Sequence, residues 1–149
     1  MLKNIHIETA ISLAKESNVK EEIPVGCVIF ENGGEIISKA YNLIEKNFDP
    51  TAHAEILAIR EACKKLKVKK LENCSIFVTL EPCEMCKNAI YQAGIKKIFF
   101  GAYSENLNIS FNSKYLIDIA SEVEDQKLKI NLKDSVSPVL IEDISDKNS

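Results

Sequence analysis

The sequence predicts an α/β fold, a three-layer α/β/α domain whose central mixed sheet of five strands carries helices on both faces. Three observations predict it. The chain has 149 residues, of which 46% are hydrophobic and 28% charged, an ordinary balance for one domain with a real core. Two β-rich runs near the N-terminus are joined by a turn signal. Helical and strand patterns then alternate, which favours crossover connections and a parallel strand pair.

The first expected elements are a helix and a hairpin. Residues 1–17 interleave charged and apolar side chains, which indicates an amphipathic helix rather than a signal peptide or a membrane span. The runs "IPVGCVIF" (23–30) and "EIISKAY" (35–41) are β-rich, and the "ENGG" between them is typical of a hairpin turn. The following "YNLIEKNFDP" (41–50) is interpreted as a polar loop.

A helix, a strand, a second helix and a second strand are expected next. Asp49 and Pro50 predict a helix start, because the missing N–H of proline is not needed in a first turn. The apolar periodicity then continues to about Leu66. The later elements are a strand at 74–80, a helix from 84 that ends at Gly94, and a strand at 96–102. The two strands are expected to pair in parallel.

Beyond Ala102 the patterns are weaker. Residues 113–124 suggest a helix, 128–132 a strand, and about 134–149 a partly frayed tail. Because no linker or repeat interrupts the first 100 residues, the whole chain, 1–149, is interpreted as a single domain.

Charge and cysteine content restrict the classes of function. A formal net charge of −3 gives no global attraction to nucleic acid, so RNA binding would need a local basic patch. No apolar run approaches the roughly 20 residues that span a bilayer. Two of the five cysteines are spaced as Cys83-x-x-Cys86, which favours thiols and metal over disulfides in a chain that is not exported. A cytoplasmic location and no association with a membrane are therefore expected.

A catalytic zinc site needs three protein ligands and one open position for water, and His53, Cys83 and Cys86 supply that set. Cys83 and Cys86 are three residues apart, so they share one face of a helix. Both would lie in the first turn after Pro82, where the helix dipole favours thiolates. His53 lies near the start of the other helix. Two helix N-termini are therefore expected to converge on one Zn²⁺ ion.

Glu55 is the predicted catalytic residue. It follows His53 by two residues, about 200° away around an ideal helix, so the two side chains cannot bind one ion side by side. If the helix begins here and directs its end at the metal, Glu55 reaches an activated water and carries its proton to a leaving group. The pair is thus interpreted as one ligand and one general acid–base.

A Cys-x-x-Cys pair by itself is also typical of a redox pair or of half a structural zinc site. A structural site requires a fourth ligand, and no further cysteine or histidine stands at a comparable spacing. His-x-Glu together with Pro-Cys-x-x-Cys after a strand favours the catalytic interpretation. Cys27, Cys63 and Cys74 are interpreted as small buried apolar residues, and His6 as a surface residue of the first helix.

This combination is the signature of the zinc-dependent nucleobase deaminases, and the chain most resembles the bacterial tRNA-specific adenosine deaminases. Four segments are similar to that family's motifs in the same order, between about residues 5 and 102: "PVGCVI", "YNLIEKNFDPTAHAEILAIREA", "FVTLEPCEMCKNAI" and "IFFGA". The resemblance implies a cytidine-deaminase-like fold and hydrolytic conversion of the wobble adenosine of a tRNA anticodon to inosine by a homodimer. It implies zinc on His53, Cys83 and Cys86, Glu55 as proton shuttle, and base binding by Asn42 and the Ala54 backbone amide.

Two regions depart from that family's pattern. Ser104 stands where the tRNA enzymes usually have an acidic residue, and "YSENLNISFNSK" (103–114) lacks the glycines that follow it there. The end of the chain, "SPVLIEDISDKNS", replaces a long helix with basic and aromatic residues. Both regions would help to contact RNA in the family. With 19 basic against 22 acidic residues, contacts to a tRNA anticodon stem-loop are expected chiefly from Lys64–Lys70 and Lys96-Lys97.

Two alternatives stay open. A deaminase of a free base, guanine or cytosine, would use the same motifs, because the core motif sets the reaction and not the base. A non-catalytic, zinc-stabilised subunit or binding module is the other alternative. The presence of Glu55 speaks against it, because a scaffold has no use for a proton carrier.

Overall fold

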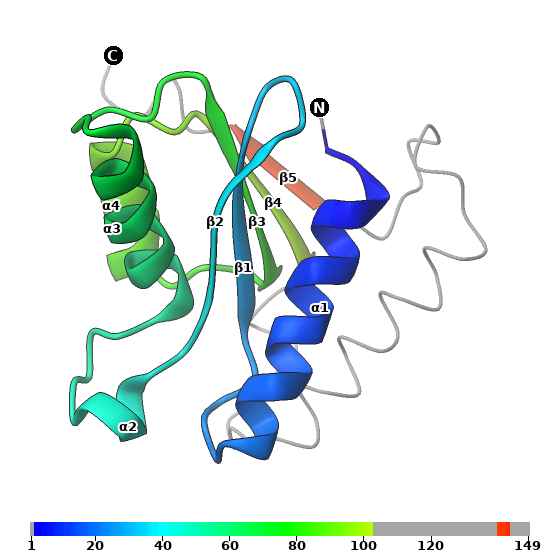
Figure 1. Cartoon of the computed structure of the whole chain (residues 1–149), viewed down its shortest axis with the longest axis vertical. Coiled ribbons are helices and arrows are strands. Elements are labelled where there is room, and N and C mark those ends of the chain that lie inside the picture. The colour runs from blue at the N-terminus through cyan, green and yellow to red at the C-terminus, as the bar shows by residue number, and fades with distance from the viewer. Residues whose placement is uncertain (1, 103–139, 144–149) are drawn as a thin grey trace.

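The computed structural model describes residues 2–102 and 140–143 of the chain. Its elements, in chain order, are α1 (Asn4–Val19), β1 (Gly26–Glu31), β2 (Ile36–Tyr41), α2 (Ile44–Asn47), α3 (Ala54–Leu66), β3 (Cys74–Leu80), α4 (Glu84–Gln92), β4 (Lys97–Ala102) and β5 (Leu140–Asp143). A single sheet has α1 on one face and α3 and α4 on the other (Figure 1). The expected layers, with helices on both faces of a sheet, are confirmed.

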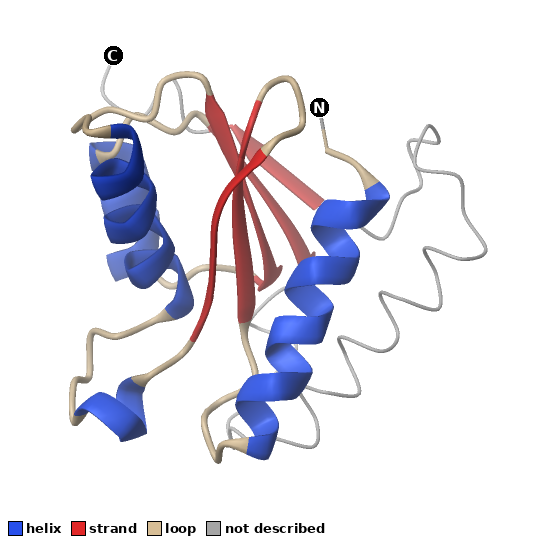
Figure 2. Cartoon of the chain, viewed as in Figure 1, coloured by secondary structure: helices blue, strands red, loops and turns tan. Residues whose placement is uncertain are grey.

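The five strands of the sheet lie in the order β2-β1-β3-β4-β5 (Figure 2). β1 pairs antiparallel with β2 and with β3, as the hairpin signal predicted for the first pair. β3 and β4 pair in parallel, as predicted, because the chain crosses over through α4 between them. β5 closes the sheet antiparallel to β4. The carboxyl ends of β3 and β4 therefore lie at the same edge of the sheet.

Two apolar cores fill the spaces between the layers, because alternate side chains of each strand point to opposite faces. On the α1 face, Val28 and Phe30 of β1 and Phe77 of β3 pack against Ile7 and Ile11. The opposite face packs against the alanines of α3 and against α4; its strand residues include Cys27, Ile29, Ile76, Val78 and Ile98. Alanine at successive turns lets α3 lie close to the sheet, which fixes the position of its N-terminus.

Gly26 is required where α1 crosses the start of β1. A Cβ atom on this residue would lie 1.8 Å from the carbonyl oxygen of Ala10 and 3.0 Å from the backbone nitrogen of Ala14. Only a residue without a side chain allows this approach. Gly94 has a φ of +83° just beyond α4, as predicted for the left-handed residue that ends this helix.

The structure corrects the predicted start of α3. The helix begins at Ala54 and not at Asp49-Pro50. Asp49 instead forms a turn of its own, in which its carboxylate accepts hydrogen bonds from the backbone N–H and the hydroxyl of Thr51, at 2.9 and 2.7 Å. This local bonding competes with helix formation, as is common for aspartate. The delayed start places His53 at the N-cap and Glu55 in the first turn.

Two further predictions differ from the structure. The segment interpreted as a polar loop contains the short helix α2. His6, expected at the surface, is fully buried and stacks on Phe30 with a ring-centroid distance of 3.8 Å. Its Nδ1 accepts the backbone N–H of Lys3, and Nε2 lies 2.7 Å from the carbonyl oxygen of Gly34, so the ring is neutral with its proton on Nε2.

The helix expected at 113–124 and the strand expected at 128–132 lie outside the described residues. Within the stretch expected to fray, residues 140–143 form β5. Across the parts of the chain that the structure describes, no helix has the length and apolar character needed to cross a membrane.

Candidate metal centre and active-site pocket

Two helix N-termini meet at the edge of the sheet where β3 ends. His53 is the N-cap residue of α3, and Cys83, three residues beyond the end of β3, is the N-cap residue of α4. Cys86 follows in the first turn of α4 and is fully buried. The structure thus brings together the three side chains that the sequence singled out as metal ligands.

The spacing of the three ligand atoms fits a zinc ion. The Nδ1 atom of His53 lies 3.7 Å from Sγ of Cys83 and 3.4 Å from Sγ of Cys86. With ordinary zinc bond lengths, a nitrogen and a sulfur on one tetrahedral ion lie about 3.6 Å apart. All three ligand atoms lie within 4.8 Å of one another, the one such group found among the described residues. Two thiolates and one imidazole are also the donor types that zinc prefers.

Electrostatics at this point favour a cation. Burial raises the pKa of the Cys86 thiol, and the nearby charge of Glu55 raises it further. A buried thiolate beside a carboxylate is costly without a positive charge. The N-termini of α3 and α4 supply part of that charge through their dipoles, and a divalent cation would supply the rest.

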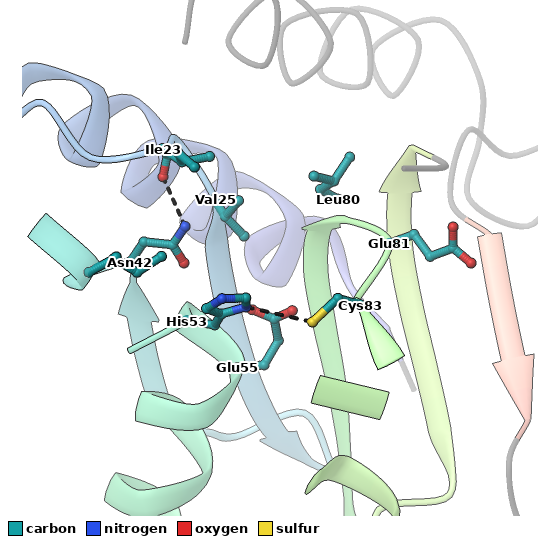
Figure 3. A pocket seen from close by; sticks show the side chains of 9 residues that line it. Ile23, Val25, Asn42, His53, Glu55, Leu80, Glu81 and Cys83 are labelled. Atoms are coloured by element: carbon teal, nitrogen blue, oxygen red, sulfur yellow. Dashed lines mark hydrogen bonds between the residues drawn. The ribbon is translucent and has the colours of Figure 1, made fainter. Parts of the chain in front are cut away.

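Glu55 lies inside the pocket, beside the metal ligands. Its side chain is buried, with 4% of the residue exposed, and it points toward His53 and Cys83 (Figure 3). Burial raises its pKa from the ordinary 4.5, while hydrogen bonds from its own backbone amide and from Cys86 act in the opposite direction. A carboxyl group with a raised pKa can both accept and release a proton at neutral pH.

The cavity in front of these residues has a volume of about 310 Å³ and is lined by Ile23, Val25, Asn42, Ile44, His53, Glu55, Leu80, Glu81 and Cys83. This is at the small end of the range for ligand sites, about 300 to 1,000 Å³. The aliphatic side chains form walls, and the polar groups are concentrated around His53. The pocket therefore suits one small, flat, mostly apolar group that meets a polar reacting centre.

Of the two predicted base-binding residues, Asn42 lines this pocket, and Ala54 is hydrogen-bonded to it. The side-chain oxygen of Asn42 accepts the backbone N–H of Ala54 at 2.7 Å, and its amide nitrogen donates to the carbonyl oxygen of Ile23 at 3.2 Å. Asn42 thereby joins the end of β2 to the start of α3 and to the segment before β1. One lone pair and one N–H of the side chain remain for a ligand.

The remaining residues that the sequence singled out lie outside this pocket. Cys27 and Cys74 are buried and Cys63 is half-buried, as expected for small apolar residues. The lysines of the 64–70 run are exposed, at the end of α3 opposite to His53. A 13-residue helix is about 20 Å long, so this run is not part of the pocket.

Sequence reasoning missed the aliphatic residues of this site. The aliphatic walls, Ile23, Val25, Ile44 and Leu80, resemble ordinary core residues in the sequence. Glu81 also lines the pocket, and its carboxylate lies 3.1 Å from the ammonium group of Lys87.

Comparison with known proteins gives two family matches. The model described as "Cytidine and deoxycytidylate deaminase zinc-binding region" matches residues 3–102. The model described as "DNA polymerase III beta subunit, C-terminal domain" matches residues 95–149. The two matches share residues 95–102 and together cover residues 3–149.

Among curated relatives, a tRNA-specific adenosine deaminase of Aquifex aeolicus is 50% identical over 102 residues, which are 68% of this chain and 67% of that protein. The chain covers from 54% to 67% of the length of three such relatives. A solved structure of a tRNA:A34 deaminase is 36% identical, with a TM-score of 0.66, over 68% of this chain and 73% of that one. A guanine deaminase structure from Bacillus subtilis also has 36% identity and a TM-score of 0.66, over 79% and 76%.

Proposed function

Since the chain belongs to the cytidine and deoxycytidylate deaminase zinc-binding family, we propose that it deaminates the wobble adenosine of a tRNA anticodon to inosine. The observation that carries the proposal is the convergence of His53, Cys83, Cys86 and Glu55 on one small pocket at two helix N-termini. The 50% identity to a relative described as a tRNA-specific adenosine deaminase supports the choice of substrate.

His53, Cys83 and Cys86 would hold the zinc ion, since their donor atoms have the spacing and the chemistry that it requires. When bound there, zinc polarises water and lowers its pKa, which supplies the nucleophile of a hydrolytic reaction. Two of these residues, His53 and Cys83, line the pocket in which the base would lie.

Glu55 would move the protons. Its carboxylate takes a proton from the attacking water and gives it to a ring nitrogen of the base. A second proton, from the hydroxyl group that the attack adds to the carbon, then passes by way of Glu55 to the exocyclic amine, which leaves as ammonia when the carbon–nitrogen bond breaks and the carbonyl of inosine forms. Adenosine and water are thus converted to inosine and ammonia. The raised pKa of Glu55 suits a group that must be charged in one step and neutral in the next.

Asn42 and Ala54 are proposed to hold the base. The N–H of Ala54 donates to Asn42 in the structure, so a base would meet chiefly the remaining lone pair and N–H of the Asn42 amide. Ile23, Val25, Ile44 and Leu80 would enclose the ring and exclude bulk water. A single adenine ring is the right size and shape for such walls.

We further propose a homodimer and a cytoplasmic location, both of which follow from the resemblance to the tRNA enzymes. The interpretation of 1–149 as one deaminase domain stays a prediction. The second family match suggests a specific alternative, in which the deaminase part ends near Ala102 and the remainder has another origin. In either case the departures after Ala102 predict weak, salt-sensitive affinity for RNA.

Deamination of free guanine is the second candidate. The similarity to a guanine deaminase of Bacillus subtilis, at the same identity and TM-score as the tRNA:A34 deaminase, favours it over free cytosine. The pocket walls and the metal ligands suit either purine.

One assay separates the two candidates. Purified, zinc-loaded protein is incubated with an anticodon stem-loop that has adenosine at the first anticodon position, and separately with free guanine, cytosine and adenine. We expect inosine in the stem-loop, at a rate that falls as salt rises, and little ammonia from the free bases. Glu55→Gln serves as the control, with zinc retained and turnover reduced by about 10²- to 10⁴-fold. Efficient deamination of guanine with no inosine in the stem-loop would reject the tRNA proposal.

A further inference from the structure

Phe48 is an aromatic side chain that is exposed at an unfavourable backbone conformation. It is 95% exposed, more than any other large hydrophobic residue that the structure describes. It follows α2 with φ 50° and ψ 42°, in the left-handed region that bulky residues rarely adopt. The left-handed residue ends α2, a position that glycine or asparagine usually occupies, so a bulky aromatic residue here is strained, and strained residues are concentrated at functional sites.

The segment that carries Phe48, here called the 44–49 arm, is held firmly. Glu22 is 1% exposed, and its carboxylate accepts the backbone N–H groups of Glu45 and Lys46 at 3.0 and 2.9 Å. The N–H of Asp49 donates to the carbonyl oxygen of Ile44 at 3.1 Å, which closes the arm on itself. A buried carboxylate that bonds two amides fixes the position of the arm, so Phe48 is not on a loose loop.

The arm also forms one side of the pocket. Ile44, its first residue, lines the cavity together with His53, Glu55 and Cys83. In Figure 1 the arm, at α2, lies at the end of the molecule where α3 begins. Phe48 is four residues from Ile44 on a segment closed by a hydrogen bond, so its backbone stays close to this side of the pocket.

An RNA base is the occupant that fits this position. A nucleotide that enters the pocket is drawn out of its stack, which leaves its neighbours without stacking partners. Exposed aromatic rings bind such bases by stacking. The residues before Phe48 in the chain are the exposed, polar Glu45, Lys46 and Asn47, so within the described part of the arm the ring does not belong to a longer apolar run of the kind a protein partner would cover.

We propose that Phe48 is a stacking platform for the nucleobase next to the one that is deaminated. The proposal rests on the proposed function, since it requires a substrate in which the reacting base has neighbours. In this proposal the left-handed backbone at Phe48 exposes the ring to solvent beside the pocket, where a base next to the reacting one would bind.

The test compares kcat and KM for an anticodon stem-loop among Phe48→Ala, Phe48→Leu and Phe48→Trp. Stacking on one base is worth about 5- to 150-fold in affinity, so Phe48→Ala is expected to raise KM by a factor in this range. Phe48→Leu keeps the apolar character without the ring and should lose nearly as much, while Phe48→Trp should retain the wild-type KM. Ile5→Ala, another exposed apolar residue, in the first turn of α1, is the matched control and should change nothing.

Stem-loops with an abasic nucleotide on either side of the target adenosine identify the partner. On one of these substrates the KM of the wild type should rise by the same factor that Phe48→Ala causes on the intact stem-loop. The KM of Phe48→Ala should not rise further on that substrate. The proposal would be overturned if, on both abasic substrates, the effects of the abasic nucleotide and of Phe48→Ala on KM multiplied. A KM of Phe48→Ala equal to that of the wild type on the intact stem-loop would also overturn it. A change of molar mass in light scattering together with the loss would instead make Phe48 a contact between two copies. A wild type that forms no inosine in any stem-loop would remove the proposed function as well, so the two failures are distinguishable.

Discussion

Replacement of Asn42 by alanine tests how far the pocket depends on one side chain. In the structure this amide satisfies the buried N–H of Ala54 and the carbonyl oxygen of Ile23. Asn42→Ala leaves both backbone groups without these partners. Each loss costs about 1–3 kcal/mol, with the lower value where pocket water reaches the group. We therefore expect a loss of about 2–4 kcal/mol in the free energy of unfolding.

For a chain of this length, 1 kcal/mol lowers the Tm by about 2–4 °C, so Asn42→Ala should melt roughly 10 °C below the wild type. Asn42→Asp is the informative companion. Its carboxylate keeps the bond to the N–H of Ala54 at a helix start, where a negative charge is favourable, but it faces the Ile23 carbonyl oxygen without a donor. It should recover part of the stability of the wild type and none of the donor function toward a base.

The measurements are thermal melting at fixed zinc concentration and turnover on the stem-loop. A Tm of Asn42→Ala within about 2 °C of the wild type would refute the structural role argued here. Turnover of Asn42→Asp close to that of the wild type would show that the base does not need a donor from this residue.

Two further predictions concern the opposite face of the sheet. Gly26→Ala should lower the free energy of unfolding by about 3 kcal/mol or more, because its Cβ would lie 1.8 Å from the Ala10 carbonyl oxygen and α1 would have to move. A melting curve like that of the wild type would contradict this prediction. His6 has a pKa below its ordinary 6.5 because it is buried, with smaller effects from the Gly34 carbonyl, which raises it, and from the N-terminus and Lys3, which lower it. The folded chain therefore keeps the ring neutral, so its contribution to stability is complete above about pH 6.5 and is lost as the pH falls toward the folded value. Melting between pH 7 and 5 should show a steeper loss for the wild type than for His6→Gln, whereas equal slopes would mean that His6 does not titrate with unfolding.

The fold was predictable where patterns are long and local. The apolar runs of β1 and β3 and the periodicity of α3 show directly in the sequence, and the end of α3 at Leu66 agrees with the prediction. α2 was missed because four residues show no periodicity, and its N-terminal amides are bonded to the distant Glu22. His6 was misplaced because nothing near it in the sequence shows that Phe30 and Gly34 enclose it.

The candidate metal ligands were predictable for a different reason. Histidine and cysteine are scarce in this chain, and few arrangements of them have ligand chemistry, so residue type and spacing were sufficient. The pocket walls were not predictable, because Val25 and Leu80 have the same apolar character as the core. The bond between Asn42 and Ala54 joins residues whose separation in the sequence gives no indication of a contact.

Both helix starts at the site carry a candidate metal ligand where a capping residue would ordinarily stand. His53 and Cys83 occupy the N-cap positions of α3 and α4, and neither side chain makes a capping hydrogen bond. Serine, threonine, aspartate or asparagine at such a position is worth about 0.5–2 kcal/mol over a residue that does not cap. The ligand residues therefore leave the metal-free protein less stable than its fold allows.

The variant Cys83→Ser measures how much stability the missing cap of α4 costs. The variant should lose zinc, because serine is a poor ligand for it, yet its hydroxyl can accept a backbone N–H of the first turn of α4. The Tm of Cys83→Ser should therefore be about 2–6 °C higher than that of the metal-free wild type. It should stay below the Tm of the zinc-loaded wild type, because zinc binding stabilises the folded state. Cys63→Ser, inside α3 and away from any cap, is the matched control and should give no increase. A metal-free Cys83→Ser that melts at or below metal-free wild type would show that the helix start is already satisfied without a capping side chain, and that the ligand set carries no cost in stability.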